Sequence, residues 1–255
     1  THHELINAKH GHFLVPIHDT ILHPILKNYG TWEEDLLNLL NPFIPEGSLV
    51  IDVGANIGAI AIPLAKFTGP KGRVLAFEAQ RKLYYTLASN IVLNSMYNIY
   101  AYHSIVGYLT NNNFTTIQSI DLQQNKNFMM FSVHDATGNT KKIEVEEEEV
   151  ATVTLDDFTT NPINCPDGLY NHTTSICCPS VIKIDVEGYE LHVLKGSIKI
   201  LQQCRTIYHL ENNCASLSPL LIKTLQSYNY TIFWHMTFSS EIKSSYNGKI
   251  ASENH

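Results

Sequence analysis

The chain has 255 residues, of which 44% are hydrophobic and 10% aromatic, and its formal net charge is −7 at pH 7. Such a composition supports a buried core and excludes a disordered tail, a collagen-like rod or a small disulfide-stabilised scaffold. Nucleic-acid-binding proteins carry basic surfaces that neutralise phosphates, so the acidic balance argues against nucleic acid as the main partner. No segment contains the roughly 18 to 20 consecutive apolar residues of a membrane span.

The first residues contain neither the basic nor the apolar segment of a secretory signal peptide, and the chain does not begin with Met. We therefore expect a processed product or a piece of a longer chain. Five cysteines lie at positions 165, 177, 178, 204 and 214. An odd number with two adjacent members is a poor disulfide framework, which predicts free thiols and a reducing, cytoplasmic compartment. Three N-glycosylation sequons begin at Asn113, Asn171 and Asn229, a number that 22 asparagines produce by chance.

The segment 48–107 alternates between strand and helix patterns. Short apolar, β-branched runs predict buried strands, and apolar residues at helical spacing predict amphipathic helices between them. The predicted strands are 49–53, 73–77 and 99–106, and the predicted helices are 57–67 and 82–93. Strands and helices that alternate in this way form right-handed crossovers and a parallel sheet.

The same alternation returns near the C-terminus. Strands are predicted at 181–186, 206–210 and 231–235, and helices at 190–203 and 217–227. The segment between the two halves lacks helical periodicity but alternates as strands do at 128–133 and 143–154, which predicts a β-rich insertion. In that insertion we expect the acidic run 146–149 to be a solvated strand edge, followed by a loop at 161–180.

The whole chain is therefore predicted to be one α/β domain. Its parts are an N-terminal cap (1–47), a first half that contains the glycine turn described below (48–107), the insertion and loop (108–180), and a second half (181–255).

A glycine-rich turn joins the first predicted strand to the first predicted helix and reads Asp52-Val53-Gly54-Ala55-Asn56-Ile57-Gly58. Glycine lets the backbone approach a ligand closely, and a helix start offers free N–H groups. The spacing differs from the Gly-x-Gly-x-x-Gly fingerprint of dinucleotide-binding proteins. Glu78 ends the next strand, where a carboxylate can accept hydrogen bonds from both ribose hydroxyls of a nucleoside.

Several segments together extend this pattern over nearly the whole chain. They are 11–16, 29–33, 50–58, 72–79, 90–94, 154–158 and 182–197, the last reading IKIDVEGYELHVLKGS. In this order they resemble the FkbM-type family of class I S-adenosylmethionine-dependent methyltransferases, and the glycine turn resembles motif I of that class. The resemblance implies a Rossmann-like fold with a mostly parallel seven-stranded sheet and helices on both faces. It also implies an enzyme that transfers a methyl group from S-adenosylmethionine to oxygen, commonly on a sugar or secondary metabolite.

The same resemblance implies which residues bind the cofactor. They are Glu33, Asp52, Gly54, Ala55, Asn56, Gly58, Glu78, Ala79, Asn90 and Asp185. Glu33 and its neighbour Trp32 would cover the methionine end of the cofactor; the alternative is an amphipathic helix that merely packs Trp32 into the core.

Ligands of an open α/β sheet bind beyond the carboxyl ends of its strands, so the catalytic candidates are the polar residues at and after the ends of the predicted strands 181–186 and 206–210. These residues allow two interpretations. In the first, Glu187 or His192 acts as general base and Asp185 orients it or contacts the methionine end. In the second, Asp185, Glu211 and Asn212 bind a divalent cation such as Mg²⁺, as the similar catechol-type O-methyltransferases do.

The acceptor is predicted to be a small molecule or glycan, and most often a sugar hydroxyl. The alternatives are a lipid, polyketide or amine acceptor, or a non-catalytic module of a larger glycan-modifying protein. We expect residues 108–150 to lie beside the cofactor pocket and to supply part of the acceptor site, with Asn125 and Asn127 as hydroxyl partners.

Overall fold

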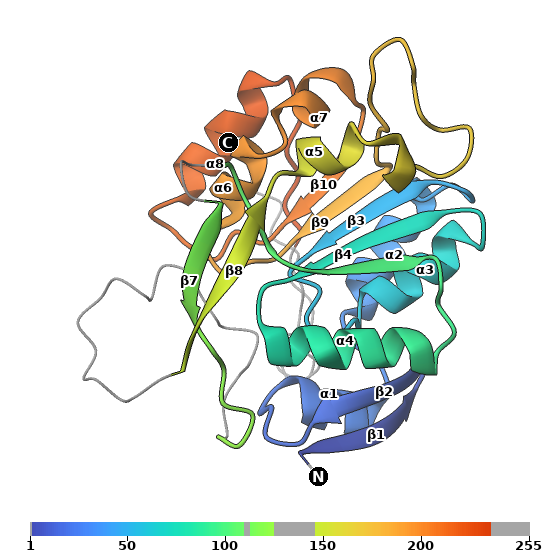
Figure 1. The fold of residues 1–255 in the computed structure, drawn as a ribbon, viewed down its shortest axis with the longest axis vertical. Coiled ribbons are helices and arrows are strands. Elements are labelled where there is room, and N and C mark those ends of the chain that lie inside the picture. Colours follow the sequence, from blue (N-terminus) through green and yellow to red (C-terminus); the bar gives the residue numbers. More distant parts are fainter. Residues whose placement is uncertain (1, 110–112, 125–145, 236–255) are drawn as a thin grey trace, which may run out of the picture.

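A computed structural model describes residues 2–109, 113–124 and 146–235 of the chain. In this part, a five-stranded parallel sheet lies between two layers of helices, with an N-terminal hairpin and a second, three-stranded sheet at its sides (Figure 1). The central strands are β3 (Leu49–Val53), β4 (Arg73–Glu78), β5 (Ile99–His103), β9 (Val181–Ile184) and β10 (Ile207–Leu210). Their order is β10-β9-β3-β4-β5. The predicted α/β architecture with a parallel sheet is confirmed.

The expectation of seven strands is not met in the described residues. Residues 231–235, predicted as a strand, form none and make no backbone hydrogen bond with the described part of the chain. Their apolar alternation resembles a strand, but a strand also needs a partner, and Phe233 and Trp234 remain 85% and 70% exposed.

The structure has helices at all four predicted positions (57–67, 82–93, 190–203 and 217–227), with different ends, and further helices in the N-terminal cap and before the loop 161–180. They are α1 (Leu22–Tyr29), α2 (Glu34–Leu40), α3 (Ala61–Thr68), α4 (Arg81–Leu93), α5 (Leu155–Thr159), α6 (Glu190–Lys195), α7 (Ile198–Gln203) and α8 (Ser218–Ser227), with short 3₁₀ turns η1 (Asn41–Phe43) and η3 (Pro162–Asn164). The predicted helix 190–203 is interrupted at Gly196, where a Cβ atom would lie 2.2 Å from the carbonyl oxygen of Gly107. This close approach of two backbones separates α6 from α7. None of the described helices combines the length and the apolar character needed to cross a membrane.

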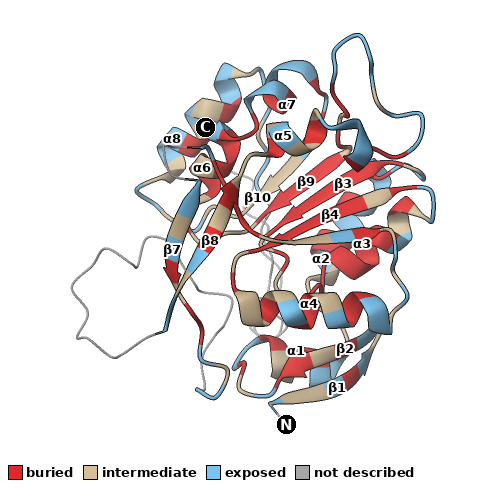
Figure 2. Ribbon diagram, viewed as in Figure 1, coloured by how far each residue is buried: buried red, intermediate tan, exposed pale blue. Residues whose placement is uncertain are grey.

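Alternate residues of the central strands pack on opposite faces of the sheet, as the pleat requires. Val50 belongs to the core under α1 to α4, whereas Leu49 and Ile51 belong to the core under α5 to α8. Every residue of β3 is buried (Figure 2), which explains why all of them but Asp52 are apolar.

The N-terminal cap is an antiparallel hairpin of β1 (His3–Ala8) and β2 (Gly11–Pro16), followed by α1 and α2. Asn90, fully buried in α4, fixes this hairpin. Its side-chain amide donates hydrogen bonds to the carbonyl oxygens of Leu14 and Ile57 and accepts one from the Leu14 N–H. Asn90 therefore joins the hairpin, the glycine turn and α4.

The predicted insertion is described only at its two ends. Strands β7 (Phe114–Gln118) and β8 (Glu147–Val153) form a sheet with β6 (Ile105–Val106) in the order β6-β8-β7. The predicted strand 128–133, and Asn125 and Asn127, lie outside the described residues.

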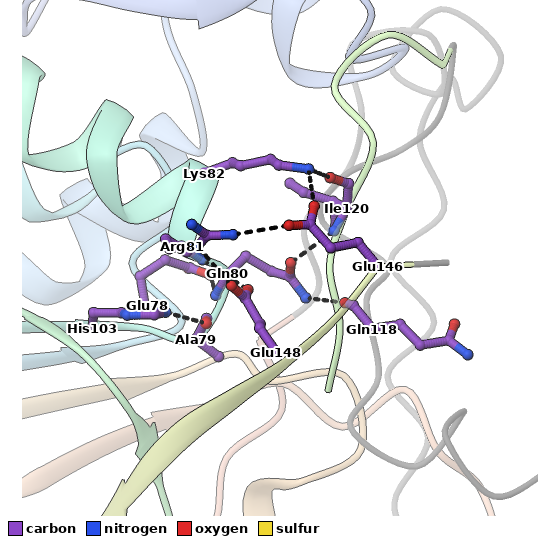
Figure 3. Close-up of polar contacts among 10 residues, drawn as sticks. All are labelled: Glu78, Ala79, Gln80, Arg81, Lys82, His103, Gln118, Ile120, Glu146 and Glu148. Carbon is purple, nitrogen blue, oxygen red and sulfur yellow. Dashed lines mark hydrogen bonds and ion pairs between the residues drawn. The ribbon is translucent and has the colours of Figure 1, made fainter. Parts of the chain in front are cut away.

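The acidic run 146–149 was predicted to be a solvated edge, and most of it is: Glu146, Glu147 and Glu149 are exposed, and among the described strands this part of β8 pairs with β7 alone, since β6 pairs only with Thr152 and Val153. Glu148 is less exposed than its neighbours, and Arg81 at the start of α4 pairs with it at 2.9 Å and with Glu146 at 3.2 Å (Figure 3). Lys82 also reaches Glu146, at 3.2 Å. Two of these acids, Glu146 and Glu148, thus also attach the second sheet to α4.

The prediction of free thiols is wrong for four of the five cysteines. Disulfides join Cys165 to Cys177 and Cys178 to Cys204, with Cα–Cα distances of 5.8 and 5.4 Å, and Cys214 is free. The adjacent cysteines bond to partners on different elements, which their sequence spacing did not reveal. The cytoplasmic compartment inferred from free thiols therefore loses its basis.

Replacing Asn90 by Leu tests whether its hydrogen bonds hold the hairpin and the glycine turn on α4. The change preserves side-chain size but leaves buried N–H and C=O groups of Leu14 and Ile57 without partners, so the free energy of unfolding should fall by about 2 to 4 kcal/mol. Urea denaturation followed by circular dichroism measures this. The control is Ser89→Ala on the exposed face of the same helix, which should change stability by less than about 0.5 kcal/mol. Equal unfolding midpoints for the two variants would show that the hydrogen bonds of Asn90 do not stabilise the fold in this way.

Candidate active site

A cavity opens at the carboxyl ends of β3, β4 and β9, where ligands of parallel α/β sheets bind. Its lining includes Trp32, Glu33, Gly54, Ala55, Asn56, Glu78, Ala79, Gln80, Ile105, Lys183, Asp185 and Glu187. The N-terminal segment, the glycine turn and the ends of four strands thus meet around one space, although they are far apart in the sequence.

The glycine turn is held tightly beneath the cavity. Gly54 has a φ of 79°, and a Cβ atom there would lie 1.9 Å from the carbonyl oxygen of Asp185. The N–H groups of Gly54 and Ala55 both donate to the carbonyl oxygen of Phe77, at 3.0 and 2.9 Å. Only glycine fits the first position of the turn, because both its conformation and the neighbouring strand exclude a side chain.

Gly58 has a different function in the same turn. Its φ is 88°, and a Cβ atom would come within 2.8 Å of the Leu87 side chain. Gly58 therefore allows the turn to pack against α4 and does not line the cavity. Asp52 likewise lies behind the cavity, fully buried at the end of β3.

Glu78 ends β4 with its carboxylate held by two backbone groups. Oε2 accepts a hydrogen bond from the N–H of Asn56 and Oε1 accepts one from the N–H of Gln80, both at 2.8 Å. Burial raises the pKa of Glu78 to about 7. The side chain of Gln80 in turn bonds the backbone of Gln118 and Ile120, so this carboxylate is braced by the segment that follows β7 (Figure 3).

Lys183, which our sequence interpretation missed, is a buried cation at the centre of the site. Its Nζ donates to the carbonyl oxygen of Gly54 at 3.0 Å and lies 3.3 Å from Asp52 and 3.5 Å from Asp185. Burial disfavours its charged form, but Asp52, Asp185 and Glu33 outweigh this effect and raise the pKa of Lys183. A lysine inside the apolar strand sequence VIKIDV was the signal that could have revealed it.

Glu33 reaches the cavity from the N-terminal cap. It has a φ of 44° and directly precedes α2, so the chain turns sharply there and places Trp32 and Glu33 together in the cavity wall. Burial raises the pKa of Glu33 to about 7, with a smaller opposing effect from Lys183.

Three acids converge at the ends of β9 and β10. Carboxylate oxygens of Asp185, Glu187 and Glu211 all lie within 4.8 Å of one another. Burial, followed by the close carboxylate of Asp185, raises the pKa of Glu211 to about 9. Although burial opposes it, Lys183 keeps the pKa of Asp185 below its usual value. Near neutral pH, Asp185 is therefore ionised and Glu211 holds a proton.

Two other predicted site residues make contacts outside this cluster. The ring of His192 lies between those of Tyr189 and Tyr108, with centroid distances of 4.0 and 5.5 Å. The amide nitrogen of Asn212 donates to the Ser218 hydroxyl at the start of α8, at 2.8 Å. Asn90, described above, is also absent from the cavity lining, whereas Ala79 contributes to it.

A second hollow adjoins the cavity and follows β10. It shares Glu33, Lys183 and Asp185 with the cavity and continues to Glu211 and Trp234. The acid cluster thus lies where the two spaces meet.

The charged groups around the cavity are mostly acidic, and this bears on the charge of the ligand that can bind there. The carboxyl groups of Glu33, Asp52, Glu78 and Asp185 surround a single buried lysine. Where Glu33 and Glu78 are ionised, at and above about pH 7, this excess of acid disfavours the anionic pyrophosphate of a dinucleotide and suits a nucleoside that carries positive charge.

Three solved structures illustrate what the chain is similar to. An FkbM methyltransferase from Methylobacillus flagellatus KT shares 20% identity over 71% of this chain and 37% of its own, with a TM-score of 0.42. A precorrin-6y C5,15-methyltransferase from Geobacter metallireducens GS-15 shares 10% identity over 80% and 78%, with a TM-score of 0.43. A SAM-dependent methyltransferase from Aquifex aeolicus shares 25% identity over 31% and 42%, with a TM-score of 0.27. These TM-scores are too low to support a conclusion, and the chain spans less than half the length of the first and third proteins.

No curated protein matches the chain. Residues 52–238, however, match the family described as Methyltransferase FkbM domain. This match begins at the glycine turn and includes Glu78 and the acid cluster. It confirms the resemblance seen in the sequence, and because it covers more than half of the residues, the chain belongs to the FkbM methyltransferase family.

Proposed function

We propose that this chain transfers a methyl group from S-adenosylmethionine to a hydroxyl group, and that the acceptor is a sugar or glycan. The observation that carries the proposal is the acidic nucleoside cavity, which combines the glycine turn, the buried carboxylate of Glu78 and an excess of negative charge. S-adenosylmethionine, when bound, supplies a methyl group that is already activated on a sulfonium ion.

The residues of the cavity fit the two ends of this cofactor. Glu78 keeps lone pairs for both ribose hydroxyls, because each carboxylate oxygen uses only one for the backbone. Glu33 and Asp185 would attract the positive methionine end. Ala55, Asn56 and Ala79 line the cavity between the positions of the ribose and of the methionine end. Asp52 would contribute indirectly, by pairing with Lys183.

Proton transfer is assigned to the acid cluster. A sugar hydroxyl is barely ionised near pH 7, so a positioned base should accelerate its attack about 10²- to 10⁴-fold. Burial raises the pKa of Glu187, and its carboxylate accepts a hydrogen bond from the Asn213 amide at 2.9 Å. We therefore assign the general base to Glu187. Asp185, kept ionised by Lys183, would orient the acceptor hydroxyl. His192, stacked between two tyrosines, is a poorer candidate for the base.

The same carboxylates also leave open the metal interpretation. Oxygen ligands are those that Mg²⁺ prefers, and Asp185, Glu187 and Glu211 are close enough to share one ion. In this alternative Glu187 joins Asp185 and Glu211, and Asn212 stays a candidate ligand, because its bond to Ser218 uses the amide nitrogen and a cation would bind the amide oxygen.

A hydroxyl acceptor is favoured over an amine because a hydroxyl has greater need of a general base, and Glu187 offers one beside the cofactor cavity. The adjoining hollow, with Trp234 in its wall, gives such an acceptor a route to Asp185. A methyl-transfer screen with monosaccharides, lipids, polyketides and amines tests this choice. Transfer to lipids or amines alone would replace the sugar proposal, and no transfer to any acceptor despite cofactor binding would support a non-catalytic module.

Glu78→Ala tests cofactor recognition. Loss of hydrogen bonds to a charged acceptor should weaken S-adenosylmethionine binding by about 1.5 to 3 kcal/mol, which is roughly a ten- to hundredfold increase in Kd. Isothermal titration calorimetry measures Kd, and Glu46→Ala, an exposed acid outside the cavity, is the control. Unchanged affinity in Glu78→Ala, or tighter binding of NAD than of S-adenosylmethionine, would refute the assignment.

Cofactor affinity should depend on pH near 7. Glu33 and Glu78 each have a pKa raised to about 7, so both gain a proton and lose their charge as the pH falls from 8 to 6. Each loss should weaken binding of the positively charged cofactor by up to about tenfold over this range. In Glu33→Gln, which is neutral at every pH, the dependence should become shallower.

The neighbouring residue provides the matched control for this titration. Although burial opposes them, Lys9 and His10 keep the pKa of Glu34 below its usual value, so Glu34→Gln should retain the full pH dependence. Calorimetry at pH 6, 7 and 8 compares the variants. A pH-independent Kd in the unmodified chain would count against charged carboxylates in cofactor binding.

Asp185→Asn and Glu187→Gln test the acid cluster. Each keeps the size of the side chain but removes its charge, so turnover per folded molecule should fall by about 100-fold or more. The unfolding midpoint should change little in Glu187→Gln but fall in Asp185→Asn, because Lys183 then loses a charged partner. Asp167→Asn, an exposed acid in the loop before β9, is the control. Full activity in both variants would leave neither mechanism in place.

The metal interpretation is decided in the same assay. If Glu187 acts as base, EDTA should have no effect and the rate should fall as the pH drops below the pKa of Glu187. If the three acids bind a cation, EDTA should abolish turnover and added Mg²⁺ should restore it.

A further inference from the structure

The two disulfides indicate where this chain matures. Thiols of cytosolic proteins are kept reduced, whereas disulfides form and persist in oxidising compartments. Here the fold brings four cysteines into two pairs, and Cys165, Cys177 and Cys204 are all buried in the core on one face of the sheet. Cys178, three residues before the start of β9, is bonded to Cys204 at the end of α7, so this pair connects the segment that enters a central strand to its covering helix.

The first disulfide closes a surface loop that contains one of the sequons. Cys165 and Cys177 bracket Asn171-His172-Thr173, and Asn171 is exposed. Its Oδ1 accepts hydrogen bonds from the N–H groups of Thr173 and Thr174, at 2.9 and 3.1 Å. The amide nitrogen Nδ2, by contrast, makes no hydrogen bond to the described residues. The loop thus turns the reactive atom of the sequon toward solvent.

The position of this loop keeps any attachment away from the active site. The loop leads into the amino end of β9, whereas the cavity lies at the carboxyl end of the same strand (Figure 1). The other two sequon asparagines, Asn113 and Asn229, are exposed as well. Asn171 is the one that lies inside a disulfide-closed loop, with all its neighbours described.

We propose that this chain matures in an oxidising compartment, where both disulfides form and Asn171 receives an N-linked glycan. In each disulfide, two thiols lose two protons and two electrons to a disulfide-bearing oxidant of that compartment. In the glycan transfer, Nδ2 of Asn171 forms a bond to the anomeric carbon of a lipid-pyrophosphate-linked oligosaccharide. The bond from that carbon to the pyrophosphate breaks, the lipid pyrophosphate leaves, and the amide nitrogen loses one proton.

The test uses the natural full-length chain, tagged at its C-terminus, produced in its own cells and alkylated at lysis. Digestion with peptide N-glycosidase F should increase its electrophoretic mobility. Thr173→Ala, which destroys the sequon but keeps Asn171, should remove one step of this shift, and Thr173→Ser, which preserves the sequon, should keep it. Unchanged mobility, or a shift that Thr173→Ala does not reduce, overturns the assignment of Asn171.

Peptide mass spectrometry of the same sample tests the compartment separately. Peptides linked through Cys165–Cys177 and Cys178–Cys204 should be present before reduction, and Cys214 should be alkylated. Alkylation of all five cysteines in the unreduced sample overturns the oxidising compartment. Neither readout depends on methyl transfer, so the outcome is independent of the proposed activity.

Discussion

The charge balance around Lys183 is the constraint on which the site depends. One ammonium group inside the sheet joins the end of β3, through Asp52, to the glycine turn, through the Gly54 carbonyl oxygen, and to Asp185 after β9. Removing one partner from such a buried group leaves an uncompensated charge, at a cost of about 3 to 5 kcal/mol. The turn and the acid cluster are therefore fixed relative to each other before any ligand arrives.

The elements around this centre brace the cavity from both sides. On one side, Asn90 holds the hairpin and the glycine turn on α4, and α2 brings Glu33 to the cavity. On the other, Gln80 and Arg81 attach the second sheet beside Glu78. The cavity is thus built from segments that the sequence keeps far apart, on a sheet whose inner strands β9, β3 and β4 are almost entirely buried.

Local sequence patterns predicted those strands and helices that have a continuous apolar run or apolar residues at helical spacing. The strand 49–53 is observed as predicted, and the helix predicted at 82–93 begins only one residue earlier. Contacts between distant segments were not predictable in this way. The disulfides, the break at Gly196 and the pairing of Lys183 with Asp52 all depend on which elements become neighbours in space. Two of these left a local sign: Gly196 interrupts a helical pattern, and a cation in an apolar strand calls for a buried acid.

The surplus of acid around Lys183 also bears on the end of the reaction cycle. Under the proposed activity, loss of the methyl group turns a positively charged sulfonium into a neutral thioether. The attraction exerted by Glu33 and Asp185 on that sulfur then disappears, while the contacts of Glu78 with the ribose remain. The spent nucleoside is consequently held less tightly than the fresh one, so exchange of product for substrate is driven by the chemistry itself.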